Sequence, residues 1–356
     1  MENESTKRVM ESLNFQGPDR IPMFDSFWDE FTEKWRKEKS AGKEADICDF
    51  YGIDLVFPVP DETFFPTAKA VIGQEGSYLI CRDGWGRTVK MRENASFSQT
   101  IDTVLRNRND LDNLSFDPPD LDIRYESFVK TVEKEKKKRC VFSCVGGPFA
   151  RSSFIRGEAD FLIDLAGDIG FAGELVDMVT EHLIAVGLES LRRGNLHDTG
   201  IWISDDMGFN DAPMFSPKIF EKIFLPPYKK IVSSFKKAGA KKVILHCDGN
   251  VNSLLDMLIE AGIDGINPVE PKAGMDILKL REKYNNKLFY IGGVDNAAVL
   301  PSGDKEKIKS HILPIIEAGK NGGIIIGTHS VSPDISVETY DYYYSVVQKY
   351  GHYKKG

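Results

Sequence analysis

The stretch KVILHCDGNVNSLLDMLIEAGIDGINPVE (residues 242–270) contains a complete strand–helix–strand unit. It begins with the β-branched apolar run KVILH (242–246), and apolar residues then recur at helical spacing in VNSLLDMLIEAG (251–262). Gly262 is the expected C-terminal stop of that helix, and GINPVE (265–270) is a second short apolar run. Two strands joined by one helix and short loops predict a βαβ unit with parallel strands.

The same alternation continues in both directions from this unit. Further runs of strand type are RIPMF (20–24), IDLVFPVP (53–60), RCVFSCVG (139–146), GIWISDD (200–206), KLFYIGGVD (287–295) and GIIIGTH (323–329). Eight parallel strands with helical crossovers predict an α/β fold, the closed (β/α)8 TIM barrel. A doubly wound open sheet is the alternative.

The alternation is interrupted once, between the second and third predicted strands. Residues 61–118 contain SYLICRDGWGRTVKMRE, which alternates like a hairpin around a glycine-rich turn. We predict one barrel domain over residues 1–356, with 61–118 as an insertion near the barrel mouth.

Composition excludes several classes of protein. The 356 residues carry a net charge of −8, which argues against a nucleic-acid partner. No apolar run approaches the roughly 20 residues that span a bilayer, and the polar N-terminus does not resemble a secretory signal, so we expect a cytoplasmic protein without a membrane partner. The five cysteines lack regular spacing, so a metal site would depend mainly on His, Asp and Glu.

In a TIM barrel the chemistry is carried by residues that end strands at the C-terminal face. The predicted strand ends there are rich in acids and histidines: Asp25, Asp205, Asp206, His246, Asp248, Glu270, Asp295 and His329. Unpaired charges are costly to bury, and core stability does not predict such a cluster. We therefore expect an active site at this face.

Four of these residues have the chemistry of a divalent metal site. His246 and Asp248 are two apart and point to the same side of a strand, while Glu270 and His329 end the sixth and eighth strands. Two imidazoles and two carboxylates suit Zn²⁺ with one open position. Each residue also has a structural alternative: the histidines as satisfied strand-end residues, Asp248 as a helix cap, and Glu270 as a partner of Lys272.

Several longer segments resemble the uroporphyrinogen decarboxylase superfamily of barrels over nearly the whole chain. They are GPDRIPMF (17–24), VGGPFARSSFIRGEADF (145–161), SPKIFEKIFLPPYKKI (216–231), LHCDGNVNSLLDMLIEAGIDGINPVEP (245–271), YIGGVDNAAVL (290–300) and IIIGTHSVSPDISVE (324–338). The resemblance implies a TIM barrel that is either a decarboxylase or a zinc-dependent methyltransferase serving a corrinoid protein.

The resemblance favours the methyltransferase branch. The decarboxylases carry two arginines after the first strand, whereas DSFWDEF (25–31) contains none and would repel a polyanionic porphyrinogen. In the methyltransferases zinc is bound by His-x-Cys, a Glu and a late Cys. His246 and Glu270 match the first and third of these ligands, while Asp248 and His329 replace the two thiolates. That exchange argues against thiol methylation and for a harder, more Lewis-acidic ion.

The resemblance therefore implies a corrinoid-linked demethylase that uses Zn²⁺. It would take a methyl group from a small O- or N-methylated compound, with a methoxylated aromatic favoured, and pass it to a corrinoid protein. Its catalytic residues would be Asp248, Glu270 and His329. Substrate would contact Asp205, Asp206, Asn250, Phe27 and Trp85, and a homodimer is possible.

Two other classes of function stay open. The first is a decarboxylase of a non-porphyrin acid, or an activity like that of uroporphyrinogen decarboxylase, with His329 as proton donor and no metal. The second is a non-catalytic barrel that binds a metal or a corrinoid as a partner subunit. Metal content and turnover of a methyl donor would discriminate between these classes.

Overall fold

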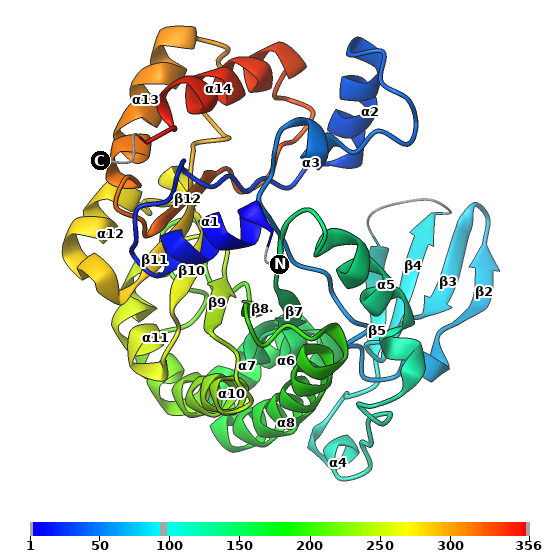
Figure 1. Cartoon of the computed structure of the whole chain (residues 1–356). Coiled ribbons are helices and arrows are strands. Elements are labelled where there is room, and N and C mark those ends of the chain that lie inside the picture. Colours follow the sequence, from blue (N-terminus) through cyan, green and yellow to red (C-terminus); the bar gives the residue numbers. More distant parts are fainter. Residues whose placement is uncertain (1–2, 93–97, 354–356) are drawn as a thin grey trace.

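The parallel strands of the chain form a closed ring surrounded by helices (Figure 1). The structure is a computed structural model that describes residues 3–92 and 98–353. One sheet has the order β12-β11-β10-β9-β8-β7, and β1 pairs with β6. The bounds are β1 (Leu55–Val56), β6 (Cys140–Val141), β7 (Ser143–Gly146), β8 (Gly200–Ser204), β9 (Lys242–His246), β10 (Gly265–Val269), β11 (Phe289–Gly293) and β12 (Ile324–Gly327).

The first predicted strand, residues 20–24, closes the ring although it is too short to count as a strand. Met23 forms a parallel bridge with Ile326 of β12, and its carbonyl accepts the Asp54 N–H at 2.9 Å. Pro22 within this segment has no N–H to give to the ladder, which limits its regular pairing. The TIM barrel expected from the sequence is confirmed.

Helices pack around the outside of the barrel. Helix α8 (Ile169–Gly194) is the longest, and α1 (Glu4–Leu13) instead lies across one end of the ring (Figure 1), where its Val9 and Leu13 join the core inside the strands. The remaining α-helices are α2 (Asp29–Glu38), α3 (Ile47–Phe50), α4 (Arg108–Leu111), α5 (Glu126–Glu135), α6 (Pro148–Arg156), α7 (Glu158–Gly167), α9 (Pro217–Ile219), α10 (Leu225–Lys237), α11 (Leu255–Ala261), α12 (Ile277–Tyr284), α13 (Lys305–Ala318) and α14 (Val337–Tyr350). None of the described helices is both long and apolar enough to cross a bilayer.

The helical segment from Pro217 to Lys237 contains a turn of π-helix. α9 continues through a π-helical segment, Phe220–Phe224, into α10. Pro226 and Pro227 lack the N–H groups that would bind the carbonyls four residues earlier, and this favours a wider turn.

The insertion contains the predicted hairpin within a larger sheet. β3 (Tyr78–Arg82) and β4 (Arg87–Arg92) pair antiparallel around the glycine-rich turn. β2 (Ala70–Glu75) and β5 (Ser98–Thr103) extend this pair to a four-stranded sheet that lies beside the barrel (Figure 1). The turn between β3 and β4 contacts the C-terminal part of α6, where the rings of Trp85 and Phe154 meet edge to face at 5.3 Å. Its expected role as a cover of the barrel mouth stays a prediction.

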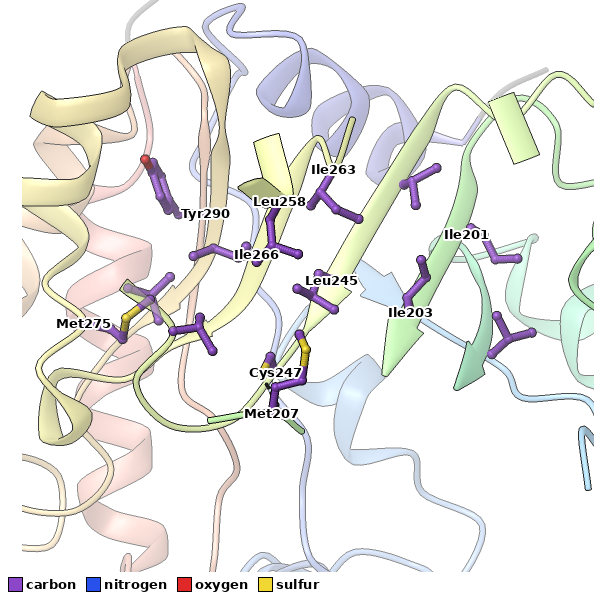
Figure 2. Packing of buried hydrophobic residues seen from close by; sticks show 14 of the residues in the cluster. Ile201, Ile203, Met207, Leu245, Cys247, Leu258, Ile263, Ile266, Met275 and Tyr290 are labelled. Carbon is purple, nitrogen blue, oxygen red and sulfur yellow. Dashed lines mark hydrogen bonds between the residues drawn. The ribbon is translucent and has the colours of Figure 1, made fainter. Parts of the chain in front are cut away.

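Two apolar cores hold the barrel together. The inner core fills the ring with side chains such as Phe142, Trp202 and Ile291. The outer core lies between strands and helices, and Figure 2 shows part of it, with Leu245 and Cys247 beside residues of neighbouring elements. Cys247 accepts the Met207 N–H at 3.1 Å and is buried in this outer core, as the alternation of side chains along β9 predicts.

Candidate metal centre at the ends of the strands

His246 ends β9, and its ring is held by a residue of the neighbouring strand. Its Nδ1 lies 2.7 Å from the side-chain oxygen of Asn267 in β10, and the amide nitrogen of Asn267 donates to the Ile291 carbonyl at 3.1 Å. Because the amide group of Asn267 is oriented by Ile291, its oxygen faces His246, and Nδ1 must carry the hydrogen. In a neutral ring, Nε2 then carries the lone pair that a ligand can use.

Asp248 lies beyond the end of β9 with one carboxylate oxygen directed at each histidine. Its Oδ1 lies 3.4 Å from His246 Nε2, and its Oδ2 lies 3.2 Å from His329 Nε2. Oδ1 is buried and has no hydrogen-bond partner among the described residues. A buried oxygen without a donor is unfavourable, so this atom marks a place where a cation would fit.

Gly249 allows the chain to turn sharply after Asp248. Its φ is +78°, and a Cβ at this position would lie 2.6 Å from the Phe209 carbonyl oxygen. The Gly249 N–H donates to Glu270 Oε2 at 2.8 Å, so the turn connects the two carboxylates. Glycine is the residue that adopts this conformation without strain.

Glu270 and His329 complete the cluster from β10 and β12. His329 Nδ1 lies 3.3 Å from Glu270 Oε1, and its Nε2 faces Asp248. Burial opposes charging of the His329 ring, but the hydrogen bonds to Asp248 and Glu270 outweigh burial and raise its pKa to about 10. Burial likewise opposes the charge on both carboxylates, but the hydrogen bonds from His329 keep the pKa of each below its ordinary value. The positively charged His329 ring thus lies between the negatively charged carboxylates of Asp248 and Glu270.

The potential ligand atoms fall into two sets of three that share Asp248. One set is Asp206, His246 and Asp248, and the other is Asp248, Glu270 and His329; within each set the ligand atoms lie within 4.8 Å of one another. The four residues predicted as ligands of one ion are therefore distributed over two sets. Asp206, predicted to bind substrate, belongs to one set, with its Oδ1 at 3.8 Å from His246 Nε2.

The donor chemistry fits a divalent transition metal. Imidazole nitrogen and carboxylate oxygen are ordinary ligands of Zn²⁺, and three protein ligands with an open position are typical of catalytic zinc. Asp248 Oδ1, which has no hydrogen-bond partner among the described residues, and the Nε2 of a neutral His246 ring would both accept a positive partner. The residues present therefore fit the expected metal.

Asp25 positions the chain just before His329. Its Oδ1 accepts both the N–H and the hydroxyl of Thr328, at 2.7 and 2.6 Å, and its Oδ2 accepts the Tyr340 hydroxyl at 2.8 Å. Burial raises the pKa of Asp25 to about 6 although these hydrogen bonds lower it. A buried network of this kind holds the end of β12 and the ring that follows it.

Asp205, predicted to hold substrate, is engaged within the fold. It is fully buried, and its oxygens accept the Phe149 and Ala150 N–H groups at the start of α6 and the Tyr228 hydroxyl. These contacts leave the neighbouring Asp206, which is half exposed, as the acid that faces the cluster. The two adjacent acids thus point in different directions.

The other three residues predicted to bind substrate, Asn250, Phe27 and Trp85, lie in different parts of the fold. Asn250 follows the Gly249 turn, and its side-chain oxygen accepts the Asn252 N–H at 3.0 Å. The ring of Phe27 packs among Phe31, Tyr51 and Tyr340. The contacts of the partly buried Trp85 are with Phe64, Phe154 and Arg151. The structure does not bring Phe27 or Trp85 into contact with the described cluster.

Sequence reasoning missed Asn267 and Phe57. Asn267 is an amide within the apolar strand GINPV, and that contrast could have indicated its role. The Phe57 ring stacks on Trp202 at 4.5 Å, and Trp202 stacks in turn on the His246 ring at 6.2 Å. Phe57 is only partly buried, and Trp202 lies between its ring and that of His246.

Comparisons with known proteins agree with this fold. A model of the uroporphyrinogen decarboxylase (URO-D) family matches residues 77–350. Two relatives, both described as methylcobamide:CoM methyltransferase MtbA, come from Methanosarcina acetivorans and Methanosarcina mazei; each is 26% identical, over 227 and 236 residues. These alignments cover 62% and 64% of this chain and 62% and 65% of the relatives, so the chain spans less than two thirds of the length of the curated relatives it matches.

A solved structure extends the likeness to the whole fold. It is described as a methyltransferase from Methanosarcina mazei and superposes with a TM-score of 0.67, covering 97% of this chain and 98% of its own. The sequence identity is 17%, so this likeness shows the fold alone.

Proposed function

We propose that this chain, which belongs to the uroporphyrinogen decarboxylase family, is a zinc-dependent methyltransferase. The residues at its strand ends are the ones expected to bind the zinc ion. The protein takes a methyl group from a small O- or N-methylated compound, a methoxylated aromatic being favoured, and passes it to a corrinoid protein. The two relatives named for methyl transfer involving a methylated cobamide support this class of reaction.

The observation that carries the proposal is the meeting of His246, Asp248, Glu270 and His329 at one end of the barrel. Each of the first three has an acceptor atom directed into the cluster, and Asp248 Oδ1 is buried with no donor in the described part of the chain. These residues would hold the ion. When bound, zinc supplies a Lewis acid that stabilises negative charge on the oxygen from which the methyl group departs.

The protein's own residues would prepare the site for this reaction. Asn267 orients His246, and the Gly249 N–H orients Glu270. Phe57 would contact the ring of an aromatic donor, because offset or edge-to-face contacts between rings are favourable. Positioning of this kind lowers the barrier by fixing the reacting groups before reaction.

Metal analysis combined with a transfer assay tests the proposal. The purified protein is expected to contain zinc and to methylate cob(I)alamin from one or more of a panel of methyl ethers and methylamines, followed by the absorbance change of the cobalamin. His246→Ala should lose both zinc and activity. His352→Ala is the matched control, because His352 is exposed near the C-terminus.

Two results would contradict the proposal. Full methyl transfer in the presence of a chelator, with no bound metal, would exclude zinc dependence. Release of CO2 from a carboxylic acid, without transfer from any methyl donor, would favour the decarboxylase alternative instead.

A further inference from the structure

The side chain of Arg151, on α6, lies over the C-terminal end of β7. A Cβ added to Gly146, the last residue of β7, would overlap Arg151 Nε. Side chains alternate along a strand, and Cys144, two residues before Gly146, belongs to the inner core. The Cβ direction of Gly146 therefore points to the inside of the barrel. Arg151 thus reaches into the mouth of the barrel, above the inner core.

Gly146 lies in the same row of the sheet as His246 of the metal centre. Gly146 pairs with Ser204 of β8, and Ser204 pairs with His246 of β9. Trp202, two residues before Ser204, belongs to the inner core, so this row also faces the inside of the barrel. Neighbouring strands lie about 4.7–4.9 Å apart, which places Gly146 roughly 10 Å from His246. Arg151 and the metal centre therefore face the same mouth, with the small side chain of Ser204 between them.

Glu62 occupies one edge of the Arg151 guanidinium. Nε and Nη2 both donate to Glu62 Oε1, the Nε bond at 2.9 Å. Glu62 is 3% exposed, and its Oε2 accepts the Gly146 N–H, so the pair is held firmly against β7. Nη1 makes no hydrogen bond within residues 3–92 and 98–353, and 14% of the Arg151 side chain is exposed. The edge formed by Nη1 and the second Nη2 hydrogen is the one that can bind a further carboxylate with two hydrogen bonds.

Aromatic rings pack against the same guanidinium. The ring centroid of Phe154, on the same helix, lies 5.0 Å from its central carbon, and that of Trp85 lies 4.7 Å away. These rings add packing, whereas the ion pair with Glu62 determines the direction of the open edge. A planar guanidinium that is already fixed loses less conformational entropy when it binds a carboxylate.

We infer that Arg151 binds a carboxylate of the methyl donor while the methylated oxygen or nitrogen faces the metal centre. The inference rests on the proposed function and narrows its donor to a methylated carboxylic acid, of which a methoxybenzoate is the aromatic case. A single guanidinium, already paired with Glu62, suits one carboxylate rather than the several of a porphyrinogen. The carboxylates of Asp206, Asp248 and Glu270 surround the metal centre and repel an anion, so they favour the orientation with the acid group toward Arg151.

Calorimetric titration of the zinc-loaded protein without a corrinoid tests the inference. The probes are the ortho, meta and para isomers of methoxybenzoate and of methoxybenzamide, because the amides keep the shape of the acids without their charge. The wild type should bind at least one acid more tightly than the matching amide. Arg151→Lys keeps a positive charge beside Glu62 but lacks the second edge. It should weaken binding of that acid by about 10–100-fold and leave binding of the amide unchanged.

Arg156→Lys is the matched control. Arg156 also lies on α6 and is ion-paired, with Asp160 and Asp164, and its variant should keep the wild-type preference for the acid. Thermal unfolding checks that each variant is folded. If Arg151→Lys does not fold, the double variant Glu62→Gln/Arg151→Gln provides the same comparison, because it removes both charges of the pair and leaves neither buried alone. The double variant should bind acid and amide equally.

Three results would overturn the inference: equal binding of acid and amide by the wild type, no binding of any acid, or an unchanged preference in Arg151→Lys. A carboxylate held by the zinc ion alone would give the last of these, because that contact does not use Arg151. The proposed function is measured separately, by methyl transfer to cob(I)alamin. Acid binding that depends on Arg151, together with release of CO2 and no methyl transfer, would overturn the proposed function and leave the carboxylate contact standing.

Discussion

The side chain of Asn267 determines which nitrogen of His246 faces the metal cluster. The His246 Nδ1–H donates to the Asn267 oxygen at 2.7 Å, and Ile291 fixes the Asn267 amide from the other side. Residues that orient a metal-binding histidine in this way also influence how tightly the metal binds.

Substitution of Asn267 should therefore weaken zinc binding without a direct metal contact. Asn267→Leu keeps a similar volume but removes the acceptor for Nδ1–H, so His246 can rotate or change tautomer. We expect zinc affinity to fall roughly 10–100-fold, measured by competition with a chromophoric chelator. Asn113→Leu, an exposed asparagine, is the control, and equal affinities in the two variants would show that Asn267 does not position His246.

Phe57 should affect aromatic methyl donors selectively. Its ring stacks on Trp202 at 4.5 Å, is partly exposed, and is separated from the His246 ring by Trp202. Phe57→Leu should raise the KM for a methoxylated aromatic by about 3–10-fold, since ring contacts contribute about 0.5–1.5 kcal/mol. Methylamines should show no change in KM, and an equal change for both donor types would assign Phe57 to the barrel core alone.

Trp85 should stabilise the insertion rather than bind substrate. Its ring contacts Phe64 and Phe154, and the Arg151 guanidinium lies 4.7 Å from the ring centroid. Trp85→Ala should lower the free energy of unfolding by about 3 kcal/mol and leave the KM for the methyl donor unchanged. Denaturant unfolding and steady-state kinetics separate these effects, because a raised KM at unchanged stability would support the substrate contact predicted from the sequence.

His182 should make stability depend on pH. Burial lowers its pKa to about 4, although the ring binds the Glu62 carbonyl at 2.9 Å. The unfolded chain has a His pKa near 6.5 and so binds more protons than the folded chain between these values. Stability from this residue is therefore fully present above about pH 6.5 and is lost as the pH falls toward 4.

The comparison of His182→Phe with the wild type isolates this effect. The variant should lose less free energy of unfolding between pH 7 and pH 5 than the wild type, as measured by urea titration. His352→Phe, at an exposed position, should follow the wild type, and a His182 variant that does the same would contradict the assignment.

Much of the fold could be predicted from local patterns. Strand periodicity located β8 to β12 closely, because buried parallel strands are continuous apolar runs with turn residues at their ends. The lengths and pairing of the first two strands were less predictable. Pro22, Pro58 and Pro60 shorten the first two strands, and pairing there depends on backbone bonds between segments far apart in the chain.

The sequence by itself determined that His246, Asp248, Glu270 and His329 end their strands on one face of a barrel, because the direction of a parallel strand fixes the end at which each residue lies. It could not determine how those side chains group. Only the tertiary structure decided that Asp248 faces both histidines, that Asp206 rather than Asp205 joins the cluster, and that Asn267 orients His246. Such details follow from the register between neighbouring strands and from side-chain rotation, which depend on contacts between residues distant in sequence.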